Sequence, residues 1–277
     1  TGGAPSLAGN DPLGHRLWIL NHEPAVAART AHFIEPLDYL NARFCGRIAA
    51  SQTSMLLSWL TDNRSTGVTT YDPALVAMAG ITTDQLPPLV PTGSVVGTVL
   101  DSAAAATGIP AGVPVVTALP DLLSATLGSG AIAAYEGHMA ISTSSWVSCH
   151  VPGKKTSIGK QMASIPSALD DYYVLANNHD TSGVCVEWAR NLLVTADDGL
   201  TTPAKASFAD LDAVAATASS GSGGVLFAPW LKGERSPVAD ADLRGGFHGM
   251  SLSTTRADIV RAVLEGVAHN NRWLLEE

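Results

Sequence analysis

The sequence places one aspartate where an α/β protein could use it for proton transfer. Asp121 directly follows an expected buried strand, residues 113–119, and precedes a helical pattern over residues 122–127, so it lies where a helix N-cap would lie. Ligands of open α/β sheets bind beyond the carboxyl ends of the strands, and a helix N-terminus favours an ionised carboxylate. Asp121 could therefore accept a proton from a substrate hydroxyl. From position alone, an ordinary capping aspartate is the more frequent explanation.

A run of hydroxyl side chains is suited to binding phosphate. Ser142, Thr143 and Ser144 lie at the turn of an expected hairpin between short strands at residues 138–142 and 146–151. Such a turn offers hydroxyl and backbone N–H groups close together, a combination that can hold a phosphate. The alternative is a polar hairpin turn without a ligand, which composition alone favours.

A glycine at the start of an expected helix could serve the same chemistry. Gly183 lies near the beginning of a helical pattern over residues 181–193, and Glu187 follows one turn later. Because glycine has no side chain, a nucleotide could approach the backbone there. The alternative is a glycine near an N-cap with no role in binding.

Several signatures of other chemistry are missing from the sequence. It contains neither G-x-x-x-x-G-K-[ST] nor G-x-G-x-x-G, which argues against a P-loop and a Rossmann dinucleotide site. It also lacks G-x-S-x-G, H-E-x-x-H and any Cys/His pair at zinc spacing. We therefore predict neither a nucleophilic hydrolase nor a zinc site, and we assign no residue as a metal ligand.

The elements that must position these residues alternate between strand and helix from Val95 onward, which indicates an α/β fold. Upstream we expect a loop over residues 1–14, helices over 24–34, 36–44 and 73–79, and a proline-rich connector over 86–91. Downstream we expect a strand over 95–99, a helix over 102–107, a strand over 172–176, a flexible loop over 219–224, a strand over 225–228 and a last helix from about 256.

Composition excludes some classes of partner. The 277 residues carry a net charge of -9 with scattered basic residues, so nucleic acid is not an expected partner. No long apolar run predicts a membrane segment. The cysteines Cys45, Cys149 and Cys185 are far apart, which favours free thiols in a reducing compartment, the cytoplasm.

A long pattern near the C-terminal end resembles a family signature. Leu-Phe-Ala-Pro-Trp-Leu-Lys-Gly-Glu-Arg-Ser-Pro at 226–237 is followed by Arg-Gly-Gly-Phe-His-Gly-Met at 244–250 and by Asp-Ile-Val-Arg-Ala-Val-Leu-Glu at 258–265. This pattern resembles the C-terminal signature of the FGGY family of carbohydrate kinases. Further segments resemble the family in the same order along the chain: 15–19, 23–24, 36–40, 86–90, 107–116 and 129–131.

The resemblance implies a fold of two actin-like (ribonuclease H-like) α/β domains around a cleft, each only partly present. Residues 1–132 would form the C-terminal part of a sugar-binding first domain. Residues 133–277 would form the N-terminal part of a nucleotide-binding second domain, with the boundary near Ile132. The missing initiator Met and the uncapped last helix also predict that the sequence is incomplete at both ends.

The resemblance further implies phosphorylation of a sugar or polyol with ATP and Mg²⁺, closest to that of xylulose kinases. Asp121 resembles the family's catalytic base, and Thr143 and Ser144 match its Gly-Thr-Ser turn near the nucleotide phosphates. Gly183 and Glu187 match a stretch beside the nucleotide. The expected partner is a small-molecule sugar or polyol, a homodimer is a possible assembly, and the 277 residues alone are expected to be inactive.

Two departures from the family pattern keep a second function open. Leu122 stands where the family has Asn or Gln, and Ser142 stands where it has glycine. The alternative is a family member that binds sugar or nucleotide without transferring phosphate and acts as a sensor or scaffold.

Overall fold

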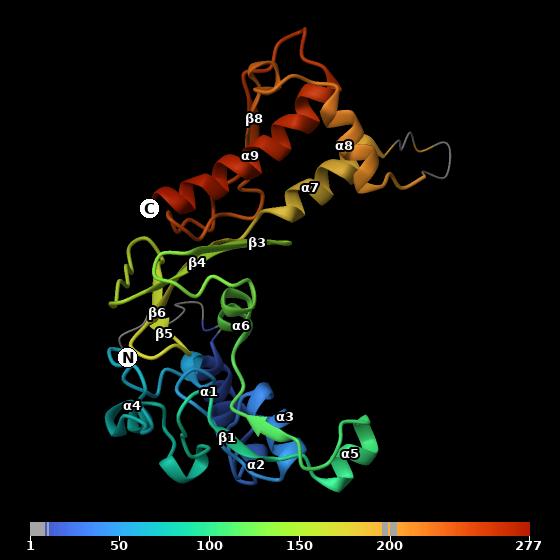
Figure 1. Ribbon diagram of the computed structural model, residues 1–277. Helices are drawn as coiled ribbons and strands as arrows, with labels where there is room; N and C mark the ends of the chain where they lie inside the picture. Colours follow the sequence, from blue (N-terminus) through green and yellow to red (C-terminus); the bar gives the residue numbers. More distant parts are fainter. Residues whose placement is uncertain (1–8, 10, 196–198, 200–203) are drawn as a thin grey trace. The chain divides into compact units, whose positions relative to one another are not determined.

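The computed structural model describes residues 9, 11–195, 199 and 204–277. The chain divides into two compact units, whose helices and strands are labelled in Figure 1. Unit 1 comprises residues 1–137, 149–156 and 163–175, and unit 2 comprises residues 138–148, 157–162 and 176–277.

The first part of unit 1 is helical, and proline begins its α-helices. Proline is tolerated at the first helical position because the N–H it lacks would have no partner within the helix. The expected loop over residues 1–14 is wrong for residues 12–14, which are helical, while residues 1–8 and 10 lie outside the described residues. The helices of this part are α1 (Pro12–His22), α2 (Pro24–Ala27), α3 (Pro36–Cys45) and α4 (Pro73–Met78), with 3-10 turns at Leu56–Ser58 and Thr83–Gln85.

Helix α2 is much shorter than the helix expected over residues 24–34. The hydroxyl of Thr30 donates to the carbonyl of Val26 at 2.9 Å. A continuing helix would use that carbonyl for the Thr30 N–H, which donates instead to Ala27. The side chain thus competes with the backbone for the helical hydrogen bond, and the helix ends at Ala27.

A short antiparallel pair follows in unit 1. Strands β1 (Val95–Thr98) and β2 (Pro114–Val116) flank helix α5 (Asp101–Thr107). The strand expected over residues 113–119 is too long, since β2 ends at Val116, and Thr117 makes the last contacts with the segment before β1. Its N–H donates to Ser94 and its hydroxyl accepts from Gly93 at 2.6 Å. Helix α6 (Asp121–Gly128) comes next, as the sequence predicts.

A four-stranded sheet has the order β3-β4-β6-β5, and its residues divide between the two units. The hairpin predicted between strands at 138–142 and 146–151 is confirmed, but its turn between β3 and β4 lies one residue earlier than predicted, at residues 142–144. The strands are β3 (Gly137–Ile141), β4 (Ser145–Val151), β5 (Ala163–Pro166) and β6 (Tyr173–His179).

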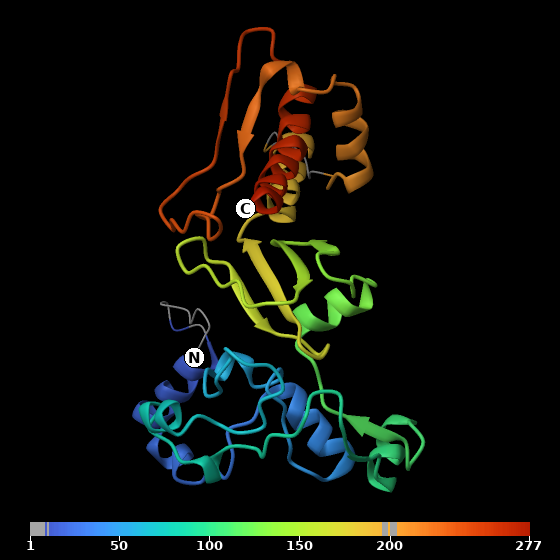
Figure 2. The same ribbon diagram turned by 60° about the vertical axis from the view of Figure 1, so that its left-hand side comes forward.

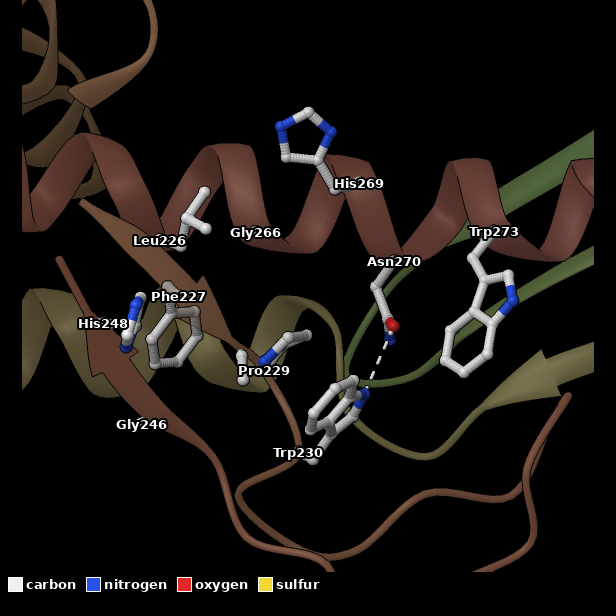
Figure 3. Close-up of a pocket in the computed structure, with 11 residues that line it drawn as sticks. Leu226, Phe227, Pro229, Trp230, Gly246, His248, Gly266, His269, Asn270 and Trp273 are labelled. Carbon is white, nitrogen blue, oxygen red and sulfur yellow. Dashed lines mark hydrogen bonds between the residues drawn. The ribbon is translucent and has the colours of Figure 1, made fainter. Parts of the chain in front are cut away.

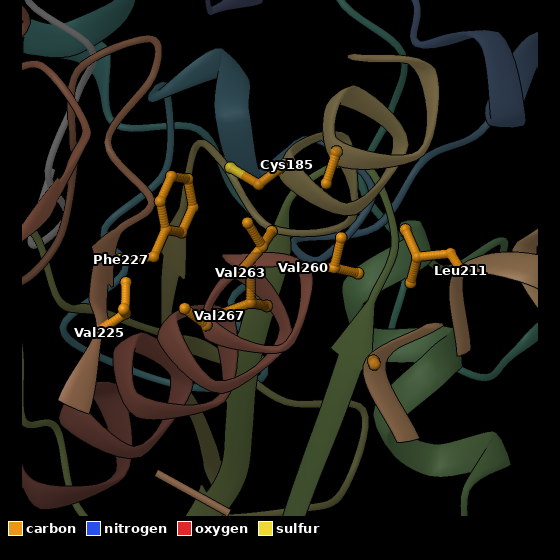
Figure 4. Packing of buried hydrophobic residues seen from close by; sticks show 10 residues of the cluster. Cys185, Leu211, Val225, Phe227, Val260, Val263 and Val267 are labelled. Atoms are coloured by element: carbon orange, nitrogen blue, oxygen red, sulfur yellow. The ribbon is translucent and has the colours of Figure 1, made fainter. Parts of the chain in front are cut away.

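Helix α9 (Arg256–Glu276) organises the core of unit 2. Its valines at 260, 263 and 267 lie on one face at helical spacing and are buried. Figures 1 and 2 show α9 beside α7 (Gly183–Ala189) and α8 (Phe208–Ala216). The short strands β7 (Leu226–Ala228) and β8 (Gly246–His248) pair antiparallel, and β7 packs against α9. The labelled core residues in Figure 4 are Cys185, Leu211, Val225, Phe227, Val260, Val263 and Val267.

The glycine-rich loop over residues 219–224 is anchored, which corrects the expected flexible loop. Ser222 is fully buried in a 3-10 turn, and its hydroxyl donates to Glu265 at 2.7 Å. The N–H of Gly221 donates to the same carboxylate at 3.1 Å. A carboxylate on α9 therefore fixes a loop whose composition alone suggests mobility.

No helix within the described part of the chain is long and apolar enough to cross a membrane.

Candidate active site

Asp121 is the first residue of α6, and the residue before it, Pro120, is the N-cap. This corrects the predicted capping position by one residue. The carboxylate is exposed, and its Oδ1 accepts the N–H of Leu122 at 2.7 Å. The helix is anchored by Leu123, which is fully buried in a core cluster of unit 1. An exposed carboxylate thus lies at the N-terminus of a well-packed helix.

The Ser142–Ser144 turn is tight. The N–H of Ser142 donates to the carbonyl of Ser144 at 2.8 Å, and the Ser142 hydroxyl approaches the same carbonyl at 3.3 Å. Ser142 and Thr143 are exposed, and Ser144 is half-buried. The side chain of Thr143 is therefore accessible from solvent.

The structure brings this turn and the start of α7 together. The N–H of Gly183 donates to Ser142 at 2.7 Å, and the N–H groups of Ser182 and Val184 donate to Thr143 at 3.0 and 3.2 Å. A Cβ at Gly183 would overlap the Ser142 carbonyl oxygen. Glycine at position 183 therefore leaves room for the Ser142–Ser144 turn. The N–H groups at the start of α7 already donate to the carbonyls of this turn.

Glu187 lies one turn further along α7 and is half exposed. Its carboxylate pairs with Arg190 at 3.1 Å. Arg190 is buried and its guanidinium lies over the ring of Phe208, 4.3 Å from the centroid. Glu187 is thus paired with a residue three positions further along the chain, and among the described residues no hydrogen bond joins it to the Ser142–Ser144 turn.

A network that the sequence interpretation missed lies at the end of β6. His179 is fully buried, with Nε2 2.7 Å from the carbonyl oxygen of Asn270 and Nδ1 2.9 Å from Oε2 of Glu234. Burial tends to raise the pKa of Glu234, but hydrogen bonds from His179, Asn270 and Arg235 outweigh it and hold that pKa below its ordinary value. Glu234 is therefore a buried carboxylate with several donors.

An apolar groove of about 480 Å³ opens between β7 and α9. Its walls include Trp230 and Trp273, and the Trp230 Nε1–H donates to Asn270 at 3.3 Å (Figure 3). None of the predicted site residues lines this groove. Within the described residues, no group of three or more His, Cys, Asp and Glu could hold a metal ion.

Two family descriptions match nearly the whole chain. The N-terminal domain of the FGGY family of carbohydrate kinases matches residues 11–128, and the C-terminal domain of that family matches residues 136–277. The chain belongs to the FGGY family.

Relatives within the FGGY family include kinases of different sugars. A xylulose kinase of Staphylococcus epidermidis is 30% identical over 259 residues, covering 93% of this chain and 49% of the relative. A gluconokinase of Bacillus subtilis is 28% identical over 269 residues, covering 94% of this chain and 50% of the relative. The chain thus spans about half the length of these curated relatives.

A solved structure supports the predicted fold class. The crystal structure of a xylulose kinase from Rhodospirillum rubrum is 28% identical, with a TM-score of 0.81 over 96% of this chain and 51% of that one. The predicted α/β fold, built from two partly present actin-like (ribonuclease H-like) FGGY domains, is confirmed.

The missed network carries one sequence signal. Glu234 lies within the segment that resembles the FGGY signature, shortly after the apolar run Leu226–Leu231. A carboxylate in such a stretch is rarely buried without partners. Its partners His179 and Asn270 come from other segments, so the sequence could mark Glu234 but not name them.

Proposed function

We propose that the protein transfers the γ-phosphoryl group of ATP to a hydroxyl of a sugar or polyol, with a xylulose-like ketose favoured. The observation that carries the proposal is the exposed carboxylate of Asp121 at the start of α6, in a chain that belongs to the FGGY family. The xylulose kinase relatives support the choice of ketose.

Asp121 acts as the general base in this proposal. Its carboxylate takes the proton of the attacking hydroxyl while the sugar oxygen forms a bond to the γ-phosphorus and the bond to the β-phosphate oxygen breaks. When bound, ATP supplies the phosphoryl group and Mg²⁺ neutralises charge on its phosphates. Mg²⁺ is commonly held by one or two carboxylates together with substrate phosphates, so we assign it no ligand set in this chain.

The Ser142–Ser144 turn fits a nucleotide phosphate through its hydroxyl groups. The hydroxyl of exposed Thr143 can donate to a phosphate oxygen, while the hydroxyl of Ser142 lies 3.3 Å from the Ser144 carbonyl oxygen and would have to turn from it to reach a phosphate. The α7 amides already donate to the turn, so Gly183 contributes by allowing the turn its position. Glu187, exposed on α7, completes the proposed nucleotide side.

The test is Asp121→Asn in the protein expressed from its complete gene. General-base catalysis contributes about 10²- to 10⁴-fold, or roughly 3 to 5 kcal/mol, so we expect kcat to fall by that factor while nucleotide affinity stays unchanged. The matched control is Asp101→Asn, because Asp101 is also an exposed first residue of a helix in unit 1. An Asp121→Asn enzyme with half the normal kcat would contradict the assignment.

The alternative function is binding of sugar or nucleotide without phosphoryl transfer. It is favoured by Leu122, which is half-buried against the core and offers no amide to a substrate, and by Ser142 in place of glycine. A screen of ATP consumption with pentuloses, hexuloses, polyols and glycerol separates the two functions. Sugar-dependent ADP release supports the kinase, and ligand binding without ADP release supports the alternative.

We further propose that the boundary between the sugar part and the nucleotide part lies near Ile132. One family match ends at residue 128 and the next begins at residue 136, which supports this position. A homodimer and a cytoplasmic location stay predictions. So does the inactivity of the 277 residues alone, which ADP release by that polypeptide would contradict.

A further inference from the structure

A buried carboxylate joins segments of unit 2 that are far apart in the sequence. Glu234 is 3% exposed, and its Oε2 accepts from the Asn270 amide at 3.0 Å and lies beside His179. Its Oε1 accepts from the N–H groups of Arg235 at 2.8 Å and Asp180 at 3.3 Å. Charge-assisted hydrogen bonds in a buried setting are strong, so Glu234 ties β6 and α9 to its own loop.

The loop that carries Glu234 also binds the connector between β6 and α7 at a second point. The hydroxyl of Thr181, in the middle of this connector, donates to the carbonyl of Pro229 at 2.7 Å. The thiol of Cys185 approaches the same carbonyl at 3.1 Å. Pro229 and Glu234 belong to one loop, residues 229–236. The bond from Asp180 to Glu234 and the bond from Thr181 to Pro229 therefore fix the connector to this loop.

The connector in turn holds the Ser142–Ser144 turn. The N–H groups of Ser182 and Gly183 donate to the Thr143 and Ser142 carbonyls. The shape of the turn therefore depends on where residues 180–182 lie, and these depend on the carboxylate of Glu234.

We propose that Glu234 is a positioning residue for nucleotide phosphate, acting through the connector at residues 180–182 on the Ser142–Ser144 turn. The proposal rests on the proposed function, because it takes that turn as the place where phosphate binds. Glu234 itself touches no nucleotide in this scheme. Its loss misplaces the hydroxyl of Thr143 and weakens nucleotide binding, with little effect on the sugar.

Unit 2 contains a matched control. Glu265 also fixes a loop, accepting from the N–H of Gly221, the hydroxyl of Ser222 and Nε of Arg261. Its contacts do not reach the Ser142–Ser144 turn or its connector. Glu234→Gln and Glu265→Gln therefore both remove a loop-fixing carboxylate, and only the first should affect the nucleotide side.

The first measurement is amide hydrogen exchange in the protein expressed from its complete gene, in the absence of ligand. In Glu234→Gln, exchange should accelerate about tenfold in peptides covering residues 140–146 and 180–186, since residues in one hydrogen-bond network are energetically coupled. In Glu265→Gln these peptides should exchange as in the unmodified protein. Unchanged exchange of both peptides in Glu234→Gln overturns the proposal.

The second measurement is function, with the substrates kept separate. In Glu234→Gln the KM for ATP should rise about tenfold, while the KM for the sugar and kcat per folded enzyme stay within about threefold. A merely structural role would reduce the amount of folded enzyme and leave the KM for ATP unchanged, which also overturns the proposal. If Glu234→Gln fails to fold, Thr181→Val removes only the hydroxyl bond to Pro229 and should show the same pattern at smaller size.

Calorimetric titration with ADP separates failure of this proposal from failure of the proposed function. A protein that binds ADP but transfers no phosphate overturns the kinase function, and a loss of ADP affinity in Glu234→Gln then still supports the positioning role. Equal ADP affinity in the two proteins overturns the positioning role. A protein that binds no ADP overturns both.

Discussion

Glu234 in unit 2 and Asp38 in unit 1 are both buried carboxylates, but their surroundings differ. Glu234 accepts hydrogen bonds from side-chain and backbone donors, and its pKa lies below the ordinary value. Asp38 is fully buried, and neither of its oxygens has a well-formed hydrogen bond within the described residues. Burial raises its pKa to about 7, the Ser54 hydroxyl opposing and the charge of Glu35 adding to the increase. The donors, rather than the burial, decide which carboxylate stays ionised.

The buried arginine of unit 1 donates to a hydroxyl group and not to Asp38. Arg16 is 4% exposed, its Nη2 donates to the hydroxyl of Ser58 at 3.1 Å, and that hydroxyl donates to Glu35 at 3.0 Å. The guanidinium also lies over the ring of Phe33. Unit 1 thus buries an arginine and an aspartate without pairing them, whereas unit 2 pairs its histidine and glutamate directly.

The largest expected effect is on the pH dependence of stability. Because the pKa of Asp38 is raised from 3.8 to about 7, the folded protein binds more protons than the unfolded chain between these values. Stability should therefore fall by about 4 kcal/mol as pH rises from about 4 to 7, and Asp38→Asn should abolish this loss. Urea unfolding at pH 4 and pH 8 measures it.

The control for Asp38 is Asp84→Asn, an exposed carboxylate of the same unit. This variant should keep the pH dependence of the unmodified protein. An Asp38→Asn protein that still loses this stability as pH rises would show that another group causes the loss, and the contrast between Asp38 and Glu234 would disappear.

A smaller effect of opposite sign is expected in unit 2. The pKa of Glu234 is lowered, so its stabilisation is present above the ordinary value and is lost as pH falls through the lowered one. Glu234→Gln leaves His179 without its charged partner and should cost about 3 kcal/mol at pH 7. Thermal unfolding followed by circular dichroism measures the loss. A variant as stable as the unmodified protein would mean that the pair contributes nothing net.

The smallest expected effect compares one glycine from each unit. Gly183→Ala places a Cβ against the Ser142 carbonyl and should cost about 2 kcal/mol. Gly128, at the end of α6, has no neighbour within 4 Å of an added Cβ, so Gly128→Ala should be neutral or stabilise by up to about 1 kcal/mol. Equal unfolding midpoints for the two variants would contradict the close packing of the turn on α7.

Local patterns predicted those elements whose causes are local. The apolar spacing of α9 and the hairpin turn at Ser142–Ser144 were readable because each depends on residues near in sequence. The early end of α2 was not, since the apolar spacing does not show that the Thr30 hydroxyl and the Arg29 N–H both donate to the Val26 carbonyl. The end of β2 at Val116 was not either, because it depends on pairing with β1, which lies about twenty residues upstream.

The candidate site divides in the same way. Asp121 could be placed at a helix start from its neighbours, and the family resemblance named it as the base. The resemblance placed the turn and Gly183 on the same nucleotide side, but their direct hydrogen bond could not be predicted because forty residues of chain separate them. The partners of Glu234 could not be predicted, because only the tertiary packing brings His179 and Asn270 next to it.

The position of Cys185 makes the reactivity of its thiol a measure of local opening in unit 2. The thiol is fully buried against Pro229, and burial raises its pKa to about 11. Alkylating reagents attack the thiolate, so Cys185 is protected both by exclusion of the reagent and by its proton. Its labelling rate should therefore measure how often α7 separates from the loop at residues 229–236. Cys45, a half-buried free thiol in unit 1, should be alkylated at a separate rate.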